Sequence, residues 1–164
     1  MDKERIEEEM QILQKKLHYE FKDISYLAEA MRCDKLEKVG NDEYSNEYHA
    51  FLGDAIIKFL IADRLYVNSN DKHKGYLTDK KANLESNKVF AKIVEEEDIK
   101  RHSYNVMYFF TDDIAESKEM PKFQKHDPYI EAIAAAIYRD GGLNAVSEWF
   151  EKWLFPRLEK NSAK

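Results

Sequence analysis

The hydrophobic positions of this chain recur at helical spacing along most of its length. Ile6, Met10, Leu13 and Leu17 lie three to four residues apart, which predicts a first helix over residues 3–17. A second helix is expected after the HYEFKD segment, and the polar stretch of residues 34–45 is expected to be a loop. Five glycines and three prolines in 164 residues leave little room for hairpins. We therefore predict an all-α fold of about seven helices.

The longest apolar segment covers residues 47–66 and is apolar on most sides, which predicts the central buried helix of the domain. Further helices are predicted over residues 78–96, from residue 127 to the glycine pair at 141–142, and over residues 143–158. Asp127 and Pro128 are typical of a helix start, because Asp accepts bonds from unpaired amides and Pro suits the first helical position. Residues 98–124 fit either a short strand or a helix, and we favour a helix.

Length and composition indicate one soluble domain. The single cysteine, Cys33, excludes an internal disulfide framework and fits a reducing compartment. No apolar run reaches the roughly 20 residues that span a bilayer, and the charged start lacks the apolar centre of a signal peptide. We expect an intracellular protein, cytoplasmic or nuclear, with no membrane partner.

The net charge of −6 argues against nucleic-acid binding through overall charge. Basic side chains nevertheless gather in one short region, at Lys72, Lys74, Lys80 and Lys81. A local basic strip can bind phosphates on an acidic protein, although the affinity would be modest. The alternative is an exposed helix face of solvated lysines.

Three acids stand out within the apolar segments. Glu47 and Asp54 lie seven residues apart, so both project from one face of the predicted helix, with Ala50 between them. Asp54 and Glu131 each lie inside an apolar run, where an unpaired carboxylate is costly to bury. If packing brings them together, a cation is needed between them, and oxygen ligands suit Mg²⁺. The alternative is that Asp54 pairs with a lysine or caps a backbone group, while Glu131 lies on an exposed edge.

The segment NEYHAFLGDAII resembles the signature of the ribonuclease III family, NERLEFLGDAVL. Three more segments, LHYEFKDISYLAEAMRC, GYLTDKKANLESNKVFAKIV and EAIAAAIYRDGGLNAV, are similar to further blocks of that family and come in the same order. The resemblance implies an all-helical endonuclease domain that forms a homodimer and cuts double-stranded RNA with Mg²⁺, or with Mn²⁺ as a substitute. It divides the chain into an acidic helical extension (1–12), the endonuclease domain (13–158) and a short tail (159–164).

The resemblance also assigns roles position by position. Glu47 matches the first Glu of the signature, Asp54 matches its metal-binding Asp, and Glu131 matches the last catalytic Glu. Phe51 matches the Phe that inserts into the partner subunit, and Leu52 is expected beside it in the dimer interface.

Two catalytic positions depart from the family pattern. Ala50 stands where the family has its second Glu, and Pro128 stands where the family has a further Asp. Asp127 is either a substitute for that acid, completing a metal site with Asp54 and Glu131, or only a helix cap.

The altered positions leave three explanations open: a degenerate natural protein kept for RNA or protein binding, an active enzyme with a rearranged site, or an engineered alanine at position 50. We predict a ribonuclease III-like endoribonuclease, with a degenerate double-stranded-RNA-binding or protein-interaction module as the alternative. The sequence ends soon after Trp153, without room for a double-stranded-RNA-binding domain. Weak RNA affinity is therefore expected unless a separate RNA-binding partner protein contributes.

Overall fold

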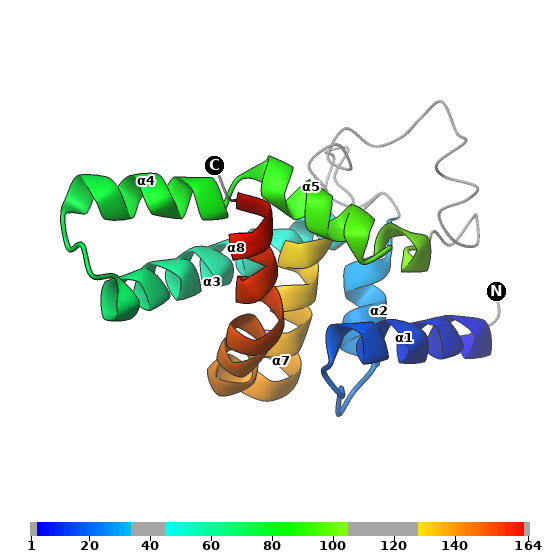
Figure 1. Ribbon diagram of the computed structural model, residues 1–164. Helices are drawn as coiled ribbons and strands as arrows, with labels where there is room; N and C mark the ends of the chain where they lie inside the picture. The colour runs from blue at the N-terminus through cyan, green and yellow to red at the C-terminus, as the bar shows by residue number, and fades with distance from the viewer. Residues whose placement is uncertain (1–2, 34–44, 105–127, 163–164) are drawn as a thin grey trace.

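A computed structural model describes residues 3–33, 45–104 and 128–162 of the chain (Figure 1). The described elements, in chain order, are α1 (Lys3–Leu17), α2 (Ser25–Met31), α3 (Ser45–Asn68), α4 (Lys74–Leu84), α5 (Asn87–Glu96), the 3₁₀ turn η2 (Lys100–His102), α7 (Tyr129–Trp149), the π-helical turn η4 (Phe150–Leu154) and α8 (Phe155–Ser162). The only strand-like pairing in these ranges is an isolated bridge between Arg32 and Tyr104. The predicted all-α fold is confirmed. None of the helices in these ranges is long and apolar enough to cross a membrane.

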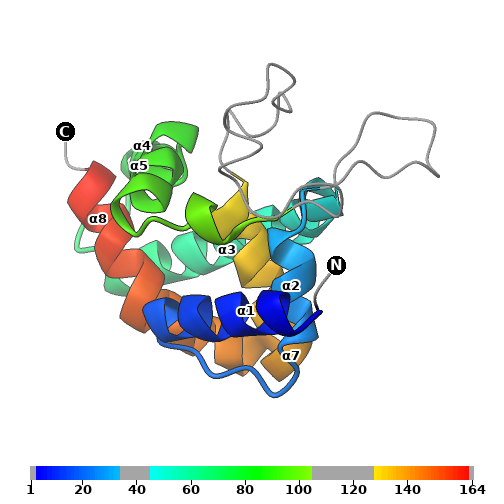
Figure 2. The same cartoon turned by 90° about the vertical axis from the view of Figure 1, so that its right-hand side faces the viewer.

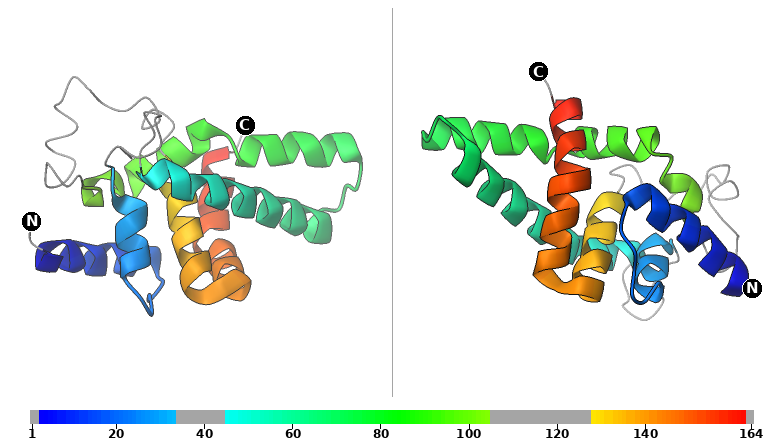
Figure 3. Two further views of the ribbon diagram at one scale, coloured as in Figure 1. Left: turned by 180° about the vertical axis from the view of Figure 1, so that it is seen from behind. Right: turned by 60° about the horizontal axis from the view of Figure 1, so that its bottom comes forward.

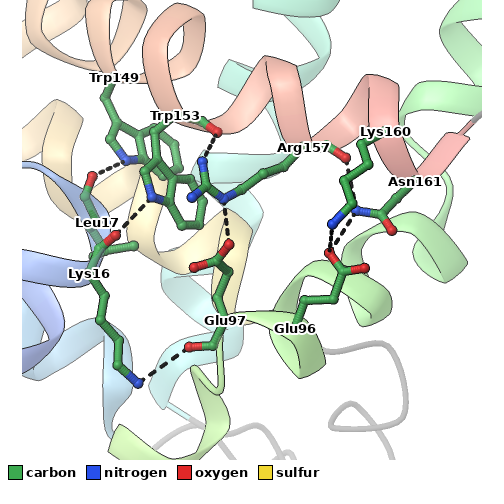
Figure 4. Close-up of polar contacts among 9 residues, drawn as sticks. All are labelled: Lys16, Leu17, Glu96, Glu97, Trp149, Trp153, Arg157, Lys160 and Asn161. Carbon is green, nitrogen blue, oxygen red and sulfur yellow. Dashed lines mark hydrogen bonds and ion pairs between the residues drawn. The ribbon is translucent and has the colours of Figure 1, made fainter.

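Helix α1 has the predicted bounds, and the four apolar residues that predicted it are buried. The last carbonyl groups of a helix lack partners within the helix. At the end of α1, the indole Nε1 of Trp149 donates to the Leu17 carbonyl at 3.2 Å, and that of Trp153 donates to the Lys16 carbonyl at 2.8 Å (Figure 4). The two indoles are stacked with 5.4 Å between ring centroids. Residues more than 130 positions away in sequence therefore fix α1 to the rest of the fold.

The centre of the fold is the packing of α7 against α3 and α2, which Figure 2 shows from the side of α1. One face of α3 is buried, with Ile57, Ile61 and Leu65 in the core. The opposite face is exposed, including Phe51 and Phe59. The prediction that this helix is buried on most sides was therefore wrong, because α2, α4 and α7 cover only part of an apolar circumference.

The predicted helix over residues 78–96 is two helices. Helix α4 begins at Lys74 and ends at Leu84, and α5 begins at Asn87. Ser86 separates them as an N-cap, because its hydroxyl accepts a hydrogen bond from the Val89 amide at 3.3 Å. Helix α4 runs back along α3, and α8 lies across the junction of α4 and α5 (Figure 3).

The C-terminal helices break where predicted, at the glycine pair 141–142. Gly142, with a φ of 81°, takes a left-handed conformation that favours glycine and forms a kink between two helical segments of α7. The second segment is followed directly by η4 and α8, so helical structure ends at Ser162 and not at residue 158 as predicted. Pro156 cannot donate a backbone hydrogen bond, and the wider turn of η4 comes directly before it. Of the loop predicted over residues 34–45, only Ser45 is described, and it is the first residue of α3. Of the helix favoured over residues 98–124, the described part contains only the turn η2, and residues 105–124 lie outside the described residues.

Candidate functional site

Gly53 marks the point where the backbones of α3 and α7 touch. A Cβ atom built at this position would lie 1.6 Å from the carbonyl oxygen of Glu131 and 2.4 Å from its carbonyl carbon. No side chain fits there, so this glycine of the signature permits the close approach of the two helices. Asp54 is the next residue of α3 after this contact.

The two predicted metal ligands differ in exposure. Glu131 is buried, with 7% of its surface exposed, in the first turn of α7, where the helix dipole favours a negative charge. The Asp54 side chain is 45% exposed, and its Oδ2 atom lies 2.9 Å from Nζ of Lys58, one turn further along α3. The alternative in which Asp54 pairs with a lysine is therefore observed, whereas an exposed Glu131 is not.

Lys58 lies in the field of three acids. The hydrogen bond and the charge of Asp54 raise the pKa of Lys58, and the charges of Glu85 and Glu131 act in the same direction. Glu85, at the end of α4, has its own cation, because its Oε2 atom lies 2.7 Å from Nζ of Lys81. The site is thus a mixed cluster of carboxylates and ammonium groups contributed by α3, α4 and α7.

Of the remaining predicted acids, only Glu47 lies within the described residues, and it is distant from Asp54. Glu47 is half-buried in the first turn of α3. Because α3 is continuous, seven residues place Glu47 about 10 Å from Asp54 along the helix axis. Ligands of one Mg²⁺ lie only about 2 Å from the ion, so these two acids are poorly placed to share one. Asp127 lies outside the described residues, and Pro128 is the buried N-cap residue of α7.

The described side chains do not fit a divalent cation as they stand. Within residues 3–33, 45–104 and 128–162, no group of three or more His, Cys, Asp or Glu side chains is arranged to hold a metal ion. Asp54 and Glu131 offer two carboxylates, and the ammonium group of Lys58 is already bonded to one of them. Ala50, where the resemblance expects a Glu, is 8% exposed and belongs to the hydrophobic core.

Buried polar side chains fix the helix starts on either side of the site, and the sequence analysis did not identify them. Asn46, fully buried at the start of α3, donates its amide to the Cys33 sulfur at 3.8 Å. The Tyr129 hydroxyl lies 3.5 Å from the same sulfur and donates to the Ser103 hydroxyl at 3.3 Å. These bonds connect the segment after α2 with the first turns of α3 and α7. The only sequence signal was a polar Asn at the head of the signature.

The exposed face of α3 carries an apolar stripe. Phe51 is 82% exposed, and Leu52 beside it is half-buried. The stripe comprises two series of residues at seven-residue intervals: Tyr48, Ala55 and Ala62, and Leu52, Phe59 and Tyr66. Such spacing is typical of a helix that packs along a second helix. The sequence analysis placed only Phe51 and Leu52 at an interface, because it assigned the other apolar residues to the core.

The four lysines of the predicted RNA-binding strip differ in their surroundings. Lys72 donates to the Tyr66 carbonyl, and its Nζ atom lies 5.7 Å from the centre of the Tyr66 ring. Lys80 lies 5.8 Å from the centre of the Tyr76 ring, beside a polar cavity of about 370 Å³. Lys74 is exposed, whereas Lys81 is half-buried in its ion pair with Glu85. Three of the four lysines are therefore available at the α3–α4 end of the molecule.

Comparison with known proteins gives consistent matches. A family described as Ribonuclease-III-like matches residues 25–158. The chain is 32% identical over 139 residues to Ribonuclease 3 of Caldanaerobacter subterraneus, covering 82% of this chain and 57% of that protein. It is 30% identical over 166 residues to Endoribonuclease Dicer homolog 3b of Oryza sativa, covering 89% of this chain and 10% of that protein.

Solved structures support the same relationship. The fold is similar to the nuclease domain of ribonuclease III from Campylobacter jejuni, with a TM-score of 0.67 and 26% identity. The match covers 91% of this chain and 95% of that domain, whose structure shows flexibility in a region involved in dimer formation. Against the bacterial relatives, by contrast, the chain spans only part of their length, for example 57% and 63%.

Proposed function

The chain belongs to the ribonuclease III family, and on that premise we propose that it binds double-stranded RNA as a homodimer with a degenerate cleavage centre. The proposal that the cleavage centre is degenerate rests on the Asp54–Lys58 ion pair. The carboxylate expected to bind a metal ion is bonded to a lysine of the same helix. Two further positions of the family's centre hold Ala50 and Pro128, neither of which can supply a carboxylate.

The proposed duplex binding rests on the lysines at the α3–α4 end. Double-stranded RNA is recognised through its shape, phosphates and 2′-hydroxyl groups, which require cations and hydroxyl-bearing side chains at the surface. Lys72 and Lys80 each lie over a tyrosine ring, at Tyr66 and Tyr76 respectively. Tyr66 is twelve residues beyond Asp54, or about 18 Å along α3, so a duplex along this helix would contact both regions. Since the net charge is −6, binding is expected to be modest and sensitive to salt, and a separate RNA-binding partner protein would strengthen it.

The proposed homodimer rests on the apolar stripe of α3 and on Phe51 beside it. Phe51, Phe59 and Tyr66 are 82%, 55% and 72% exposed, and pairing about a two-fold axis would bury the same residues on both subunits. Sedimentation equilibrium should therefore show a dimer, and the Phe51→Ser/Phe59→Ser variant should be a monomer. Leu143→Ser, which removes an exposed leucine (48%) of α7, is the matched control and should remain a dimer. A monomeric parent protein at micromolar concentration would contradict the proposal.

Cleavage of double-stranded RNA with Mg²⁺ or Mn²⁺ is the second candidate. It is favoured by the contact of Gly53, the residue before Asp54, with the Glu131 backbone, and by Asp127 directly before Pro128. Under this proposal Asp127 would replace the missing Asp and Glu47 would assist from the same face of α3.

The two candidates are separated by one experiment. The protein is incubated with an end-labelled RNA duplex or its single strand, at low salt, with Mg²⁺ or Mn²⁺, and bound and product fractions are resolved on native and denaturing gels. The first proposal predicts a shifted duplex, little shift of the single strand and intact RNA. Discrete short products would establish the second candidate, and a duplex that does not shift even at low salt would overturn both.

A further inference from the structure

A polar cavity of about 370 Å³ lies between α3, α4 and α8, and the candidate cleavage centre does not use it. Its lining comes from the C-terminal part of α3, from the connecting residues 69–71, from Tyr76 and Lys80 of α4, and from Phe155 and Glu159 of α8. The volume lies near the lower end of the range of about 300–1,000 Å³ that is usual for ligand sites. The cavity is therefore suited to one small molecule or to one residue of a polymer.

Two of the charged side chains in the lining already have partners. Nε of Arg64 lies 2.7 Å from Oε1 of Glu151, and the guanidinium lies 4.8 Å from the centre of the Phe155 ring. Oδ1 of Asp71 accepts a hydrogen bond from the His73 amide at 2.9 Å, and this bond lowers the pKa of Asp71. These contacts account for one positive and one negative charge of the lining.

Lys80 and Glu159 supply the other two charges of the lining. Within residues 3–33, 45–104 and 128–162 neither of them takes part in an ion pair, and Nζ of Lys80 lies 5.8 Å from the centre of the Tyr76 ring. A polyphosphate would be poorly balanced by one such lysine. A single phosphate group can be bound by Lys80, whereas Glu159 can accept hydrogen bonds from hydroxyl groups. The charges therefore favour a ligand that carries one phosphate and several hydroxyl groups.

Planar and amide side chains complete the lining. Bases of unpaired nucleotides stack on aromatic rings and on arginine guanidinium planes, and amide side chains form hydrogen bonds with base edges. The cavity offers the ring of Tyr76, the guanidinium of Arg64, and the amides of Asn68 and Asn70. Nδ2 of Asn68 donates to the Arg64 carbonyl at 3.1 Å, which holds that amide in place. The phosphate, sugar and base of one nucleotide thus each have a chemically matched partner in the lining.

We propose that this cavity binds one ribonucleotide as its monophosphate, with Lys80 binding the phosphate and Glu159 accepting hydrogen bonds from the ribose hydroxyl groups. A free nucleotide and the end of an RNA strand present the same groups to the cavity. The proposal does not require duplex binding, cleavage or dimer formation, because it concerns a nucleotide measured in the absence of duplex RNA.

The test is isothermal titration calorimetry of the full chain with AMP. Adenosine, which lacks the phosphate, and 2′,3′-dideoxy-AMP, which lacks the hydroxyl groups, should each bind about tenfold more weakly than AMP, because each loses hydrogen bonds to a charged side chain. In Lys80→Met the advantage of AMP over adenosine should disappear, and in Glu159→Ala the advantage of AMP over the dideoxy compound should disappear. Lys80→Arg, which keeps the positive charge, should bind AMP like the parent.

The matched control is Lys88→Met. Lys88 is an exposed lysine of α5 that does not line the cavity, so this variant loses the same charge elsewhere and should bind AMP like the parent. A parent protein that does not bind AMP would overturn the proposal, as would an equal loss of AMP binding in Lys80→Met and Lys88→Met. Both overturning results would leave duplex binding untouched, since no duplex is present.

Competition separates the two sources of the nucleotide. A trinucleotide is too short to form a stable duplex, so it reports on the cavity alone. Displacement of AMP by a 5′-phosphorylated trinucleotide, but not by its 5′-hydroxyl form, would support the site with an RNA strand end as its ligand. Displacement by neither form would support the site with a free nucleotide as its ligand.

Discussion

Replacing Gly53 by alanine is expected to force α3 and α7 apart. The added methyl carbon would lie 1.6 Å from the Glu131 carbonyl oxygen, whereas ordinary contacts lie at 3.4–4 Å, so the helices must separate locally by ~1.8 Å. Overpacking a core costs about 1–3 kcal/mol, and a backbone obstacle that cannot rotate away places this site near the upper end. The better helix propensity of alanine offsets about 1 kcal/mol of that cost. We therefore expect a net loss of about 2 kcal/mol in the free energy of unfolding.

Urea unfolding followed by circular dichroism measures this loss, and thermal unfolding should show a melting temperature lower by roughly 4–8 °C. Gly75→Ala is the matched control. It makes the same change near the start of α4, where no heavy atom lies within 4 Å of the added carbon, so stability should be unchanged or slightly higher. If Gly53→Ala were as stable as Gly75→Ala, the close contact between α3 and α7 at Gly53 would be absent.

Three further predictions concern pH, the altered site and RNA. Burial holds the pKa of His102 below its usual value of 6.5, so the free energy of unfolding should fall as pH decreases below 6.5 through the folded-state pKa. The variant His102→Gln should flatten this pH dependence in thermal unfolding. An unchanged pH profile would show that other groups cause the dependence. Ala50→Glu should lower stability in EDTA, because position 50 is only 8% exposed. Mn²⁺ should restore part of this loss if the added carboxylate binds the ion. No recovery with Mn²⁺ would mean that position 50 is not part of a metal site. Lys72→Ala/Lys80→Ala should flatten the plot of log affinity for duplex RNA against log salt by about one to two units, and an unchanged slope would make these lysines solvated surface residues.

The sequence predicted helices best where the apolar residues form one face of the helix. The spacing of Ile6, Met10, Leu13 and Leu17 predicted both the bounds and the buried face of α1. In α3 the same type of pattern failed, because Phe51 and Phe59 are as apolar as Ile57 and only the packing of α7 determines which face is covered. The break between α4 and α5 depends on one cap at Ser86, a local signal that the apolar periodicity of residues 78–96 obscured.

The candidate site shows the same limit. The sequence indicated that Asp54 and Glu131 need a cation, and it contained the i,i+4 spacing of Asp54 and Lys58. It did not decide between a metal ion and a lysine, because the i,i+4 spacing alone does not show whether the two side chains of α3 are bonded to each other. The contacts of Asn46 and Tyr129 with Cys33 required a tertiary fold, since these residues lie far apart in the sequence.

The most direct test of the account is the affinity for a fluorescently labelled RNA duplex, measured by anisotropy once in EDTA and once in Mg²⁺ at equal ionic strength. A duplex-binding domain with a degenerate cleavage centre should bind equally in both, with the RNA recovered intact from each sample. Binding that appears only with Mg²⁺, or duplex that is cut to short products in the Mg²⁺ sample, would contradict the account.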